Sequence, residues 1–434
     1  MTASRSNVLL PPTTTLPILV ALDMFAVSLV VPLLVEYFKN AGVTQASQRE
    51  LLSSIYSFSQ IIGGLLIGAL ADSGAMSRKT ILIVSFVGSA IAYGLIVLDS
   101  FVALVVSRVV VGLVKQTMTV STTILARFTT PEDRAKHMGR LRASVLVSWT
   151  LGSSVGALLY KSVDQRAPAI ASCCLFAINV VLALLLLPDS EDTPPEKQSG
   201  ASGDRKEKKS FVSNLQACCT SHELVSVVVA SLLTTWFFRA TSSATMPTYY
   251  QELYGMEPHH RGYLQSYQSL LGVAVQSFLV GPLLKWIGGE RRASVYSATV
   301  FTLVSFLEYT GSLVVFLGFV CPVSSLASSI LSLSLSSLVT QVAPKDSLGS
   351  VLAALDVLQS AAAVTVPFYR TALFSVMQET SGRATASGDP YPLDWVVMTG
   401  LHWLFGTLVM AYLLLKPHTH HATTTTSTMK KKSE

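Results

Sequence analysis

The sequence predicts an all-α membrane protein with twelve transmembrane helices, arranged as two pseudo-symmetric halves of six helices each. Three observations lead to this fold class. The 434 residues are 50% hydrophobic and only 13% charged, with a mean hydropathy of +0.51, which is more apolar than an ordinary soluble chain. Long apolar runs recur along the whole chain, and two polar turns recur at one fixed offset.

The apolar runs are long enough to cross a bilayer. A hydrocarbon core of ~30 Å needs about 20 helical residues, and each run approaches or exceeds that length. The runs are also continuous rather than alternating with polar residues, which favours helices. The twelve predicted spans are 16–38, 51–71, 80–98, 101–125, 139–160, 167–187, 224–249, 262–287, 293–310, 313–340, 348–377 and 393–415.

A polar turn between the second and third spans has a counterpart in the second half of the chain. A shift of 213 residues superposes residues 68–79 on residues 281–292, with a glycine at the start and two basic residues at the end of each. The same shift places the polar turn 131–133 on the turn 344–346. Two matches at one offset indicate an internal repeat of half the chain, which is a construction found in many membrane transporters.

The segments between and around the two halves have the composition of linkers. Residues 189–221 are rich in proline, serine, glycine and charged residues and cannot bury a core, so they predict a flexible cytosolic linker. In chain order, the predicted organisation comprises an N-terminal tail (1–15), an N-terminal half (16–188), the linker (189–221), a C-terminal half (222–416) and a C-terminal tail (417–434).

The distribution of basic residues predicts that both termini are cytosolic. The N-terminal residues lack the short apolar core and cleavage site of a signal peptide. Of the 31 lysines and arginines, 21 fall in the two tails, the linker and the loops on the same side of the predicted spans, or within the first or last four residues of a span at that side. This bias agrees with the positive-inside rule, so we expect an integral multi-pass membrane protein with its tails in the cytosol. The net charge of +6 then reflects orientation and gives no argument for nucleic-acid binding.

Charged residues at both ends of the repeated turn predict a gate. Asp72 ends one predicted helix and Arg78 and Lys79 begin the next, so each charge faces an unfavourable helix dipole and benefits from a partner on a neighbouring helix. Such a network can form in one global state and break in another. The alternative is a set of ordinary loop charges that obey the positive-inside rule. The predicted gating-loop residues are Gly68, Asp72, Arg78, Lys79, Gly281, Arg291 and Arg292.

Six ionisable residues are candidates for a role inside the predicted spans, where a charge costs roughly 2.5–3.5 kcal/mol at a helix centre on insertion scales. Together they predict a water-filled central cavity, although any one of them could be a snorkelling side chain or a structural bond between helices. By helical rise, Asp23, Lys115 and Asp356 lie at one depth and the other three at a second depth. The predicted cavity and coupling residues are Asp23, Arg108, Lys115, Arg239, Glu308, Asp356 and Gln359.

Asp23 and Lys115 are predicted to form a buried ion pair. A lone carboxylate in this setting would tend to take up a proton, whereas a nearby ammonium would hold it ionised. Protonation of Asp23 and separation from Lys115 should therefore be linked, which would let a proton gradient drive a conformational change. The alternative is a static pair that only holds the first and fourth spans together.

No other chemistry competes with this interpretation. The sequence contains no phosphate-binding glycine-rich loop, no zinc-binding His-Glu-x-x-His helix and no nucleophile elbow, so we expect neither an enzyme nor an ATP-driven pump. We also expect no cofactor and no metal site. The expected partners are a small organic solute, the lipid bilayer and a proton as candidate coupling ion, and we expect a monomer that binds no nucleic acid.

Several motifs resemble those of the major facilitator superfamily. Gly68-x-Leu70-x-Asp72 followed by Arg78-Lys79 is similar to the loop signature of that superfamily, and Arg108 with Gly112 is similar to its fourth-helix signature. Leu22-Asp23 with Pro32, and the stretch 131–139, resemble the tetracycline-efflux branch and animal relatives named major facilitator superfamily domain-containing proteins. The resemblance implies the superfamily fold and transport of a small organic solute by alternating access.

The sequence also departs from the family pattern at two places. Ser73 follows Asp72, where the family normally has a basic residue, so the usual gating network would be loosened. The fifth-helix antiporter signature appears at residues 152–157 as Gly-Ser-Ser-Val-Gly-Ala, without its proline. We therefore discount antiport as the coupling mode and interpret these small residues as a face for close helix packing.

The predicted function is that of a secondary active transmembrane transporter of a small organic solute. The alternative is a non-transporting receptor, scaffold or assembly factor that retains the same fold. A protein of that kind has no need for ionisable residues inside its spans, and six are present. A channel is disfavoured because nothing in the sequence resembles a repeated selectivity filter.

Overall fold

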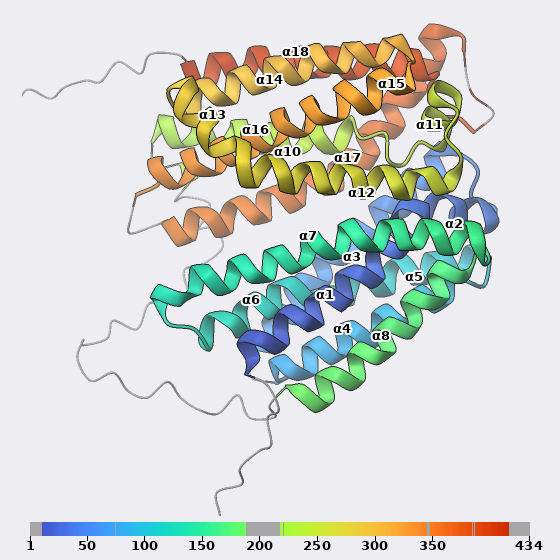
Figure 1. Cartoon of the computed structure of the whole chain (residues 1–434), viewed down its shortest axis with the longest axis vertical. Helices are drawn as coiled ribbons and strands as arrows, with labels where there is room; N and C mark the ends of the chain where they lie inside the picture. Colours follow the sequence, from blue (N-terminus) through green and yellow to red (C-terminus); the bar gives the residue numbers. More distant parts are fainter. Residues whose placement is uncertain are drawn as a thin grey trace, which may run out of the picture.

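The computed structural model of the chain is a bundle of helices in two groups (Figure 1). It describes residues 11–187 except 74, residues 218–219 and 221–344, and residues 348–415 except 384 and 386. Every regular element in the described ranges is helical, as the sequence predicts. The predicted linker and both predicted tails lie largely outside the described residues.

The first group contains the elements up to residue 187 and lies in the lower part of Figure 1. Its first helix is interrupted at Pro32, which lacks a backbone N–H and sits in a single 3₁₀ turn. The elements are α1 (Pro12–Val30), η1 (Val31–Leu33), α2 (Leu34–Asn40), α3 (Ala46–Asp72), α4 (Arg78–Ile96), α5 (Phe101–Val114), α6 (Thr117–Arg127), α7 (Pro131–Ser162) and α8 (Ala167–Leu186).

The second group lies above the first in Figure 1 and is less regular, because two helices contain a π-helical turn. Such turns leave helices locally widened and often occur at functional sites. The elements are α10 (His222–Ala240), α11 (Pro247–Tyr254), α12 (Pro258–Ala274), η2 (Val275–Leu279), α13 (Val280–Ile287), α14 (Glu290–Leu307), η3 (Glu308–Thr310), α15 (Leu313–Val315), η4 (Phe316–Val320), α16 (Cys321–Val342), α17 (Leu348–Ser381) and α18 (Pro392–Leu415).

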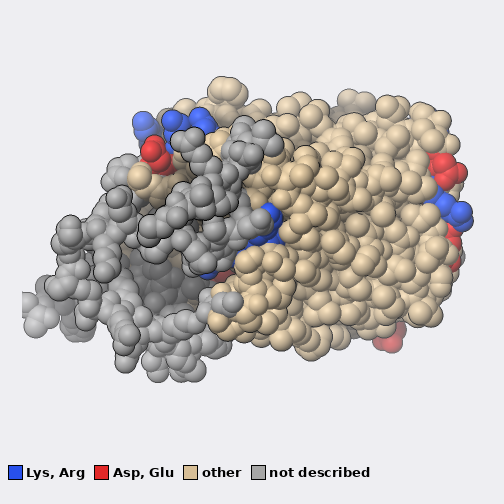
Figure 2. All heavy atoms as spheres, turned by 90° about the horizontal axis from the view of Figure 1, so that it is seen from below, with Lys and Arg blue, Asp and Glu red and all other residues tan. Residues whose placement is uncertain are grey.

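Each of the twelve predicted spans contains helix, and ten helical segments in the described ranges are long and apolar enough to cross a membrane. The two predicted spans outside that set are α14 and α17. Helix α14 starts with three charged residues, yet it packs along α16 and α18 within the second group. Seen from below, charged side chains gather toward the two ends of the molecule, and the visible flank between them is largely uncharged (Figure 2).

Several boundaries differ from the sequence prediction. In the predicted span 224–249 the helix ends at Ala240. Helix α1 begins at Pro12 rather than at residue 16. Residues 131–133, predicted as a polar turn, instead form the first turn of α7, where the Thr130 hydroxyl accepts a hydrogen bond from the Asp133 N–H at 3.4 Å. The predicted span 101–125 is broken into α5 and α6 at Lys115 and Gln116, because Lys115 leaves the helical conformation with ψ of 75°.

The repeated turn joins two helices in both halves, through five residues in the first copy and two in the second. Helix α3 ends at Asp72 and α4 begins at Arg78, while α13 ends at Ile287 and α14 begins at Glu290. In the second copy Gly288 and Gly289 have φ of 83° and 123°, a region that favours glycine and lets the chain reverse in two residues. Both turns lie at the end of the bundle where α1 begins and α18 ends. We call this the terminal end and the opposite one the far end (Figure 1).

Each half has its own apolar core, and small residues bring helices close together within the first half. Helix α1 packs along α7, where Gly156 faces the backbone of Leu29 and Gly152 faces Phe25 and Ser28. A methyl group at Gly156 would lie 2.1 Å from the Leu29 carbonyl oxygen. The small residues predicted to form a close-packing face therefore do so.

The two halves meet through α7 packed on α12 and through α3 packed on α17. The contact on α7 lies toward the far end, where Gly262 touches Ser153 and Ala157 and the Ser154 hydroxyl donates to Ser266 at 2.7 Å. A cavity of about 630 Å³ opens between α3 and α17 beside the same end.

Candidate functional site

The buried ion pair predicted in the first half is present. The Lys115 ammonium contacts the carboxylate of Asp23, which is fully buried on α1. The second carboxylate oxygen of Asp23, Oδ2, is sealed from solvent and has no hydrogen-bond partner within the described part of the chain. A buried acceptor without a donor is costly, so this carboxylate is poised to accept a further proton or hydrogen bond.

The break between α5 and α6 places the Lys115 side chain toward α1. The ammonium also lies 4.8 Å from the centre of the Phe176 ring on α8, a cation–π contact that helps to offset its desolvation. Immediately after the break, Thr117 and Ser85 share a hydrogen bond of 3.0 Å between α6 and α4. A discontinuous helix with a charged residue at the break is a recurrent feature of membrane transport sites.

Arg108 is buried on α5 without an acidic partner. It is 8% exposed, donates a hydrogen bond of 3.3 Å to Ser107 Oγ and lies 6.0 Å from the centre of the Phe38 ring. No ion pair joins this guanidinium to a carboxylate among the residues that the structure describes. The sequence predicts Arg108 in the cavity, and its missing counter-ion is a feature that only the structure reveals.

The four predicted residues of the second half are not gathered into one cluster. Glu308 accepts a hydrogen bond from the Tyr249 hydroxyl and lies 3.4 Å from that of Tyr254. Burial and then the charge of Glu308 raise the pKa of Tyr254, so this phenol on α11 keeps its proton. Asp356 is exposed on α17, and Gln359 reaches Ser231 on α10 at 3.5 Å.

Arg239 lies at the end of α10 with an exposed side chain, and its described contact with another helix is made by its backbone carbonyl. That carbonyl accepts a hydrogen bond from Arg370 at 3.4 Å. No described contact joins Arg239 to Glu308 or to Arg108, although the sequence assigns all three to one depth. Depth along the helices therefore did not predict which of these side chains meet.

The predicted gating-loop residues lie at the terminal end, and the contacts described for Lys79 and Arg291 each lie within one half. Lys79 donates to the carbonyls of Leu184 and Leu187 at 3.1 and 2.6 Å, at the end of α8. In the second copy, Arg291 pairs with Glu223 at the start of α10. The side chain of Asp72 lies outside the described residues.

The remaining members of this set have simpler surroundings. Arg78 is buried at the start of α4, and Arg292 is exposed on α14. Gly68 and Gly281 each have open space where a side chain would lie. Their matching environments agree with the internal repeat but do not by themselves establish a gate.

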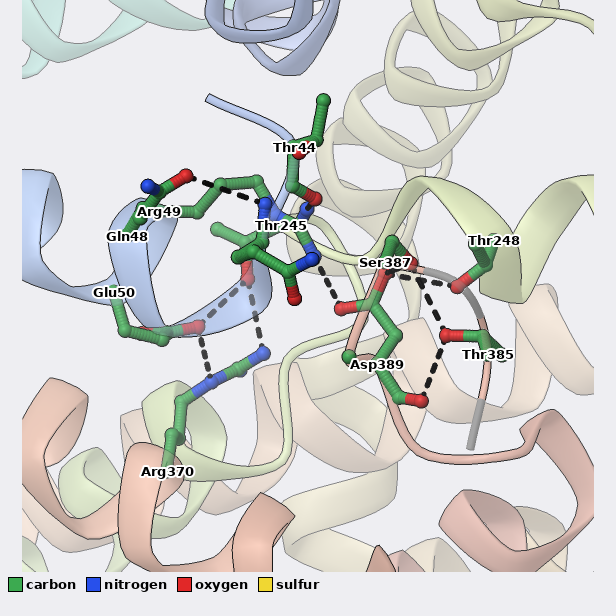
Figure 3. Close-up of polar contacts among 12 residues, drawn as sticks. Thr44, Gln48, Arg49, Glu50, Thr245, Thr248, Arg370, Thr385, Ser387 and Asp389 are labelled. Carbon is green, nitrogen blue, oxygen red and sulfur yellow. Dashed lines mark hydrogen bonds and ion pairs between the residues drawn. The ribbon is translucent and has the colours of Figure 1, made fainter. Parts of the chain in front are cut away.

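Sequence reasoning missed a set of buried ion pairs between the halves, which we call the far-end latch. Figure 3 shows two of its pairs, Arg49 with Asp389 and Glu50 with Arg370. At its centre, Arg370 on α17 donates to Glu50 on α3 at 2.8 Å, and both side chains are almost fully buried. The latch comprises the pairs Arg49 with Asp389, Glu50 with Arg370, and Glu36 with Arg261.

Hydroxyl groups from α11 and the segment before it complete the latch. The Thr245 hydroxyl accepts from Arg370 at 2.9 Å and donates to Glu50 at 3.4 Å. The Thr248 hydroxyl donates to Asp389 at 2.9 Å (Figure 3). The sequence held a weak signal for these ion pairs. Glu50 directly precedes the predicted span 51–71, and Arg370 lies inside the predicted span 348–377 toward its end. Charges near the ends of spans are usually interpreted as interfacial.

The comparisons with known proteins agree with the fold. A 29% identity over 175 residues relates 40% of the chain to 43% of the tetracycline resistance protein, class C, of Escherichia coli. The matched region thus spans less than half of that relative. Among solved structures, a mutant of the nucleoside transporter NupG has a TM-score of 0.73 at 13% identity, covering 93% of this chain and 100% of that one.

A second structural neighbour is the human organic anion transporter MFSD10, with a TM-score of 0.61 and 19% identity over 92% of this chain and 100% of that one. At these identities the two structures report the shared fold alone. A sequence profile of the family covers residues 16–367, which is most of the chain. Its extent, the helical bundle in two halves and the motifs of the first half lead to one conclusion: the chain belongs to the Major Facilitator Superfamily.

Proposed function

We propose that the chain is a secondary active transporter that moves a small organic solute by alternating access. The observation that carries the proposal is the asymmetry between the ends of the bundle. The described ion pairs between the halves, Glu36 with Arg261, Arg49 with Asp389 and Glu50 with Arg370, gather at the far end. A transporter that alternates must close one end while the other is released, and reversible ion pairs suit that purpose.

The proposal assigns the described conformation to the inward-facing state. With both termini in the cytosol, as the distribution of basic residues predicts, the far end is the non-cytosolic end. The far-end latch would then close the outer entrance while the terminal end is open to the cytosol. The gating loops at residues 72–79 and 287–292 would form their contacts between the halves in the opposite, outward-facing state.

A proton is the coupling ion that the site supports best. Asp23 offers one unpaired carboxylate oxygen beside Lys115, at a break in the fourth span. Protonation of this carboxylate would release the ammonium and change the packing of α1 against α5 and α6. The family members of known structure include a nucleoside transporter and an organic anion transporter, so these solute classes define a first panel of substrates.

The test is flux into phosphatidylcholine proteoliposomes that contain the full chain and a trapped pH-sensitive dye. We expect at least one nucleoside or organic anion to produce saturable uptake that depends on an imposed pH gradient, and we expect Asp23→Asn to abolish that dependence. Empty liposomes and a variant at the exposed Arg383 serve as controls. A ligand that stabilises the purified protein but never crosses the membrane would instead favour the receptor alternative.

A further inference from the structure

The second half contains a small cavity that is separate from the contacts between the halves. Its volume is about 130 Å³, and its walls come from the end of α10, the segment that follows it, α11, the end of α14 with η3, and α18. The described residues that line it all belong to the second half. Because α10 and α14 both end beside it, the cavity lies toward the far end of the bundle (Figure 1).

The polar side chains that line this cavity present oxygen atoms only. One is the carboxylate of Glu308, which follows the last residue of α14, and none of the described lining residues is a lysine or an arginine. The cavity has room for more than one water-sized group, and oxygen is the ligand that hard cations prefer. The hydroxyl side chains that line it with Glu308 are those of Thr241, Ser242, Ser243, Ser305 and Thr399.

The described part of the chain supplies no counter-ion for Glu308. The phenols of Tyr249 and Tyr254 donate to one carboxylate oxygen, Oε2, the second over 3.4 Å, and no described hydrogen bond reaches the other, Oε1. None of the described ion pairs includes Glu308. Arg370 approaches the same region, but it belongs to the far-end latch and donates to the Ser242 carbonyl at 2.5 Å. A half-buried carboxylate without a counter-ion is unfavourable, so it attracts a cation from solution.

The hydroxyl groups around the cavity are held in place and can accept further contacts. The indole N–H groups of Trp403 and Trp395 donate to the hydroxyls of Thr241 and Ser243, each over 3.2 Å. A hydroxyl oxygen has two lone pairs, so each keeps one for another partner. The hydroxyl of Thr399 is sealed from solvent and has no hydrogen-bond partner among the residues described. A buried polar atom of this kind indicates a water or an ion that the chain itself does not supply.

Two helix ends strengthen the negative potential at this cavity. Helix α10 ends at Ala240 and α14 ends at Leu307, directly before residues that line it. The C-terminus of a helix carries about half an elementary negative charge. One carboxylate, two helix C-termini and neutral hydroxyls together suit a cation of low charge.

We propose that Glu308 and these hydroxyl groups bind a monovalent metal cation, Na⁺, from the solution at the far end. One carboxylate neutralises one positive charge, whereas Ca²⁺ sites gather more ligands, several carboxylates among them. All the groups that hold the ion lie in the second half, so its binding does not depend on movement of the halves or on the proposed transport.

The bound ion also supports the far-end latch. The segment between α10 and α11 places Ser242 and Ser243 at the cavity. The same segment gives Arg370 two acceptors, which are the Ser242 carbonyl at 2.5 Å and the Thr245 hydroxyl at 2.9 Å. Na⁺ fixes this segment in the conformation that bonds Arg370, so binding of the ion and closure of the far end favour each other.

The test uses the full chain in phosphatidylcholine nanodiscs, at a mildly alkaline pH that keeps carboxylates ionised. NaCl or CaCl₂ replaces part of a choline chloride buffer at constant ionic strength. Binding is followed by the thermal midpoint and by tryptophan fluorescence, because Trp395 and Trp403 contact hydroxyls of the site. We expect Na⁺ to raise the midpoint and to change the fluorescence along a saturable curve. No effect of Na⁺ beyond that of choline, or a higher affinity for Ca²⁺, would overturn the inference.

Substitutions then locate the site. Glu308→Gln should weaken Na⁺ binding about tenfold or more, because it removes the charge and keeps an acceptor for Tyr249. Thr399→Val is the decisive variant, since its hydroxyl has no described partner and its loss should not prevent folding. It should weaken Na⁺ binding about threefold or more. Glu252→Gln, at an exposed carboxylate on α11, is the matched control and should bind Na⁺ normally. Unchanged Na⁺ binding in both Glu308→Gln and Thr399→Val would overturn the site.

A last measurement tests the link to the latch. In a chain without its native cysteines, Ser54→Cys places a thiol on α3 one turn beyond Glu50. Na⁺ should slow its reaction with a membrane-impermeant maleimide about threefold or more, and Glu308→Gln should abolish this effect. Na⁺ binding that leaves the labelling rate unchanged would overturn the link. Na⁺ binding without any solute flux would support the site while contradicting the transport function.

Discussion

Asp23 and Lys115 show how two residues 92 positions apart can be paired by physical argument. Each is an ionisable group inside an apolar span, and each therefore needs a partner at the same depth. The two estimated depths agree, and the side chains are in contact on α1 and at the end of α5. Among the described residues, no donor reaches the second Asp23 carboxylate oxygen.

Asp23→Asn is expected to lower both stability and pH-dependent flux. The substitution leaves the Lys115 ammonium buried with no counter-charge, and breaking a buried pair in this way typically costs about 3–5 kcal/mol. The thermal midpoint of the purified protein and the pH profile of uptake measure the two effects.

The charge-reversed double variant Asp23→Lys with Lys115→Asp is the matched control. It should regain stability whether the pair is static or part of the transport cycle. It should regain pH-dependent flux only if the position of the protonated group does not matter. An Asp23→Asn protein with normal flux and a normal pH profile would show that the pair has no coupling role.

At the scale of elements, the close approach of α1 and α7 depends on residues without side chains. Gly156→Ala should destabilise the protein by about 1–3 kcal/mol, because the new methyl group would lie 2.1 Å from the Leu29 carbonyl and force the helices apart. The thermal midpoint of the purified variant measures this effect.

Gly139→Ala on the same helix is the control, since Gly139 has no atom within 4 Å of the added methyl group. There the better helix propensity of alanine should leave stability unchanged or raise it slightly. Equal melting of the two variants would contradict the packing argument.

The turn between α3 and α4 carries the prediction for the gate. Asp72→Asn should strongly reduce transport while leaving membrane insertion intact, because the partners proposed for Asp72 form in one state and separate in the other. Uptake per molecule of inserted protein, with Ser73→Ala as the neighbouring control, is the measurement. Unaltered uptake by Asp72→Asn would reduce this turn to an ordinary charged loop.

The whole molecule is held at one end by the far-end latch. Glu50→Gln leaves Arg370 with a weakened partner, so the conformation closed at that end should lose population. A cysteine introduced at Ser54, one turn beyond Glu50 and buried, should then react with a membrane-impermeant maleimide from outside about tenfold faster or more.

The labelling experiment uses a chain without its native cysteines, and Arg383→Gln on the loop before α18 is its control. Exchange of the two charges, with Glu50→Arg and Arg370→Glu, should slow labelling again. If Glu50→Gln leaves the labelling rate unchanged, the latch is a fixed structural contact and the proposed inward-facing assignment loses its main support.

Orientation of the whole chain is testable with two tags. If both termini are cytosolic, a protease added to intact cells that carry the protein at their surface should spare a tag on either end, and should cut both after permeabilisation. Cleavage of only one tag in intact cells would mean that the number of crossings is odd. Cleavage of both would invert the assignment of the far end.

The sequence by itself determined those features that depend on local composition. Continuous apolar runs specify helices of membrane-crossing length, because burial in lipid requires every backbone group to be bonded within its own helix. The 213-residue offset between the two polar turns specifies two halves. The rule that intramembrane charges need partners was enough to pair Asp23 with Lys115 within one half.

Only the tertiary structure decided how the two halves meet. The latch joins residues 225 to 340 positions apart, Glu36 with Arg261 and Arg49 with Asp389 among them, and nothing local in the sequence specifies such pairing. Charges at span ends are equally stable in water or in lipid headgroups, so composition cannot tell a solvated side chain from a buried one. The break at Lys115 and the missing counter-ion of Arg108 depend in the same way on neighbours brought together by folding.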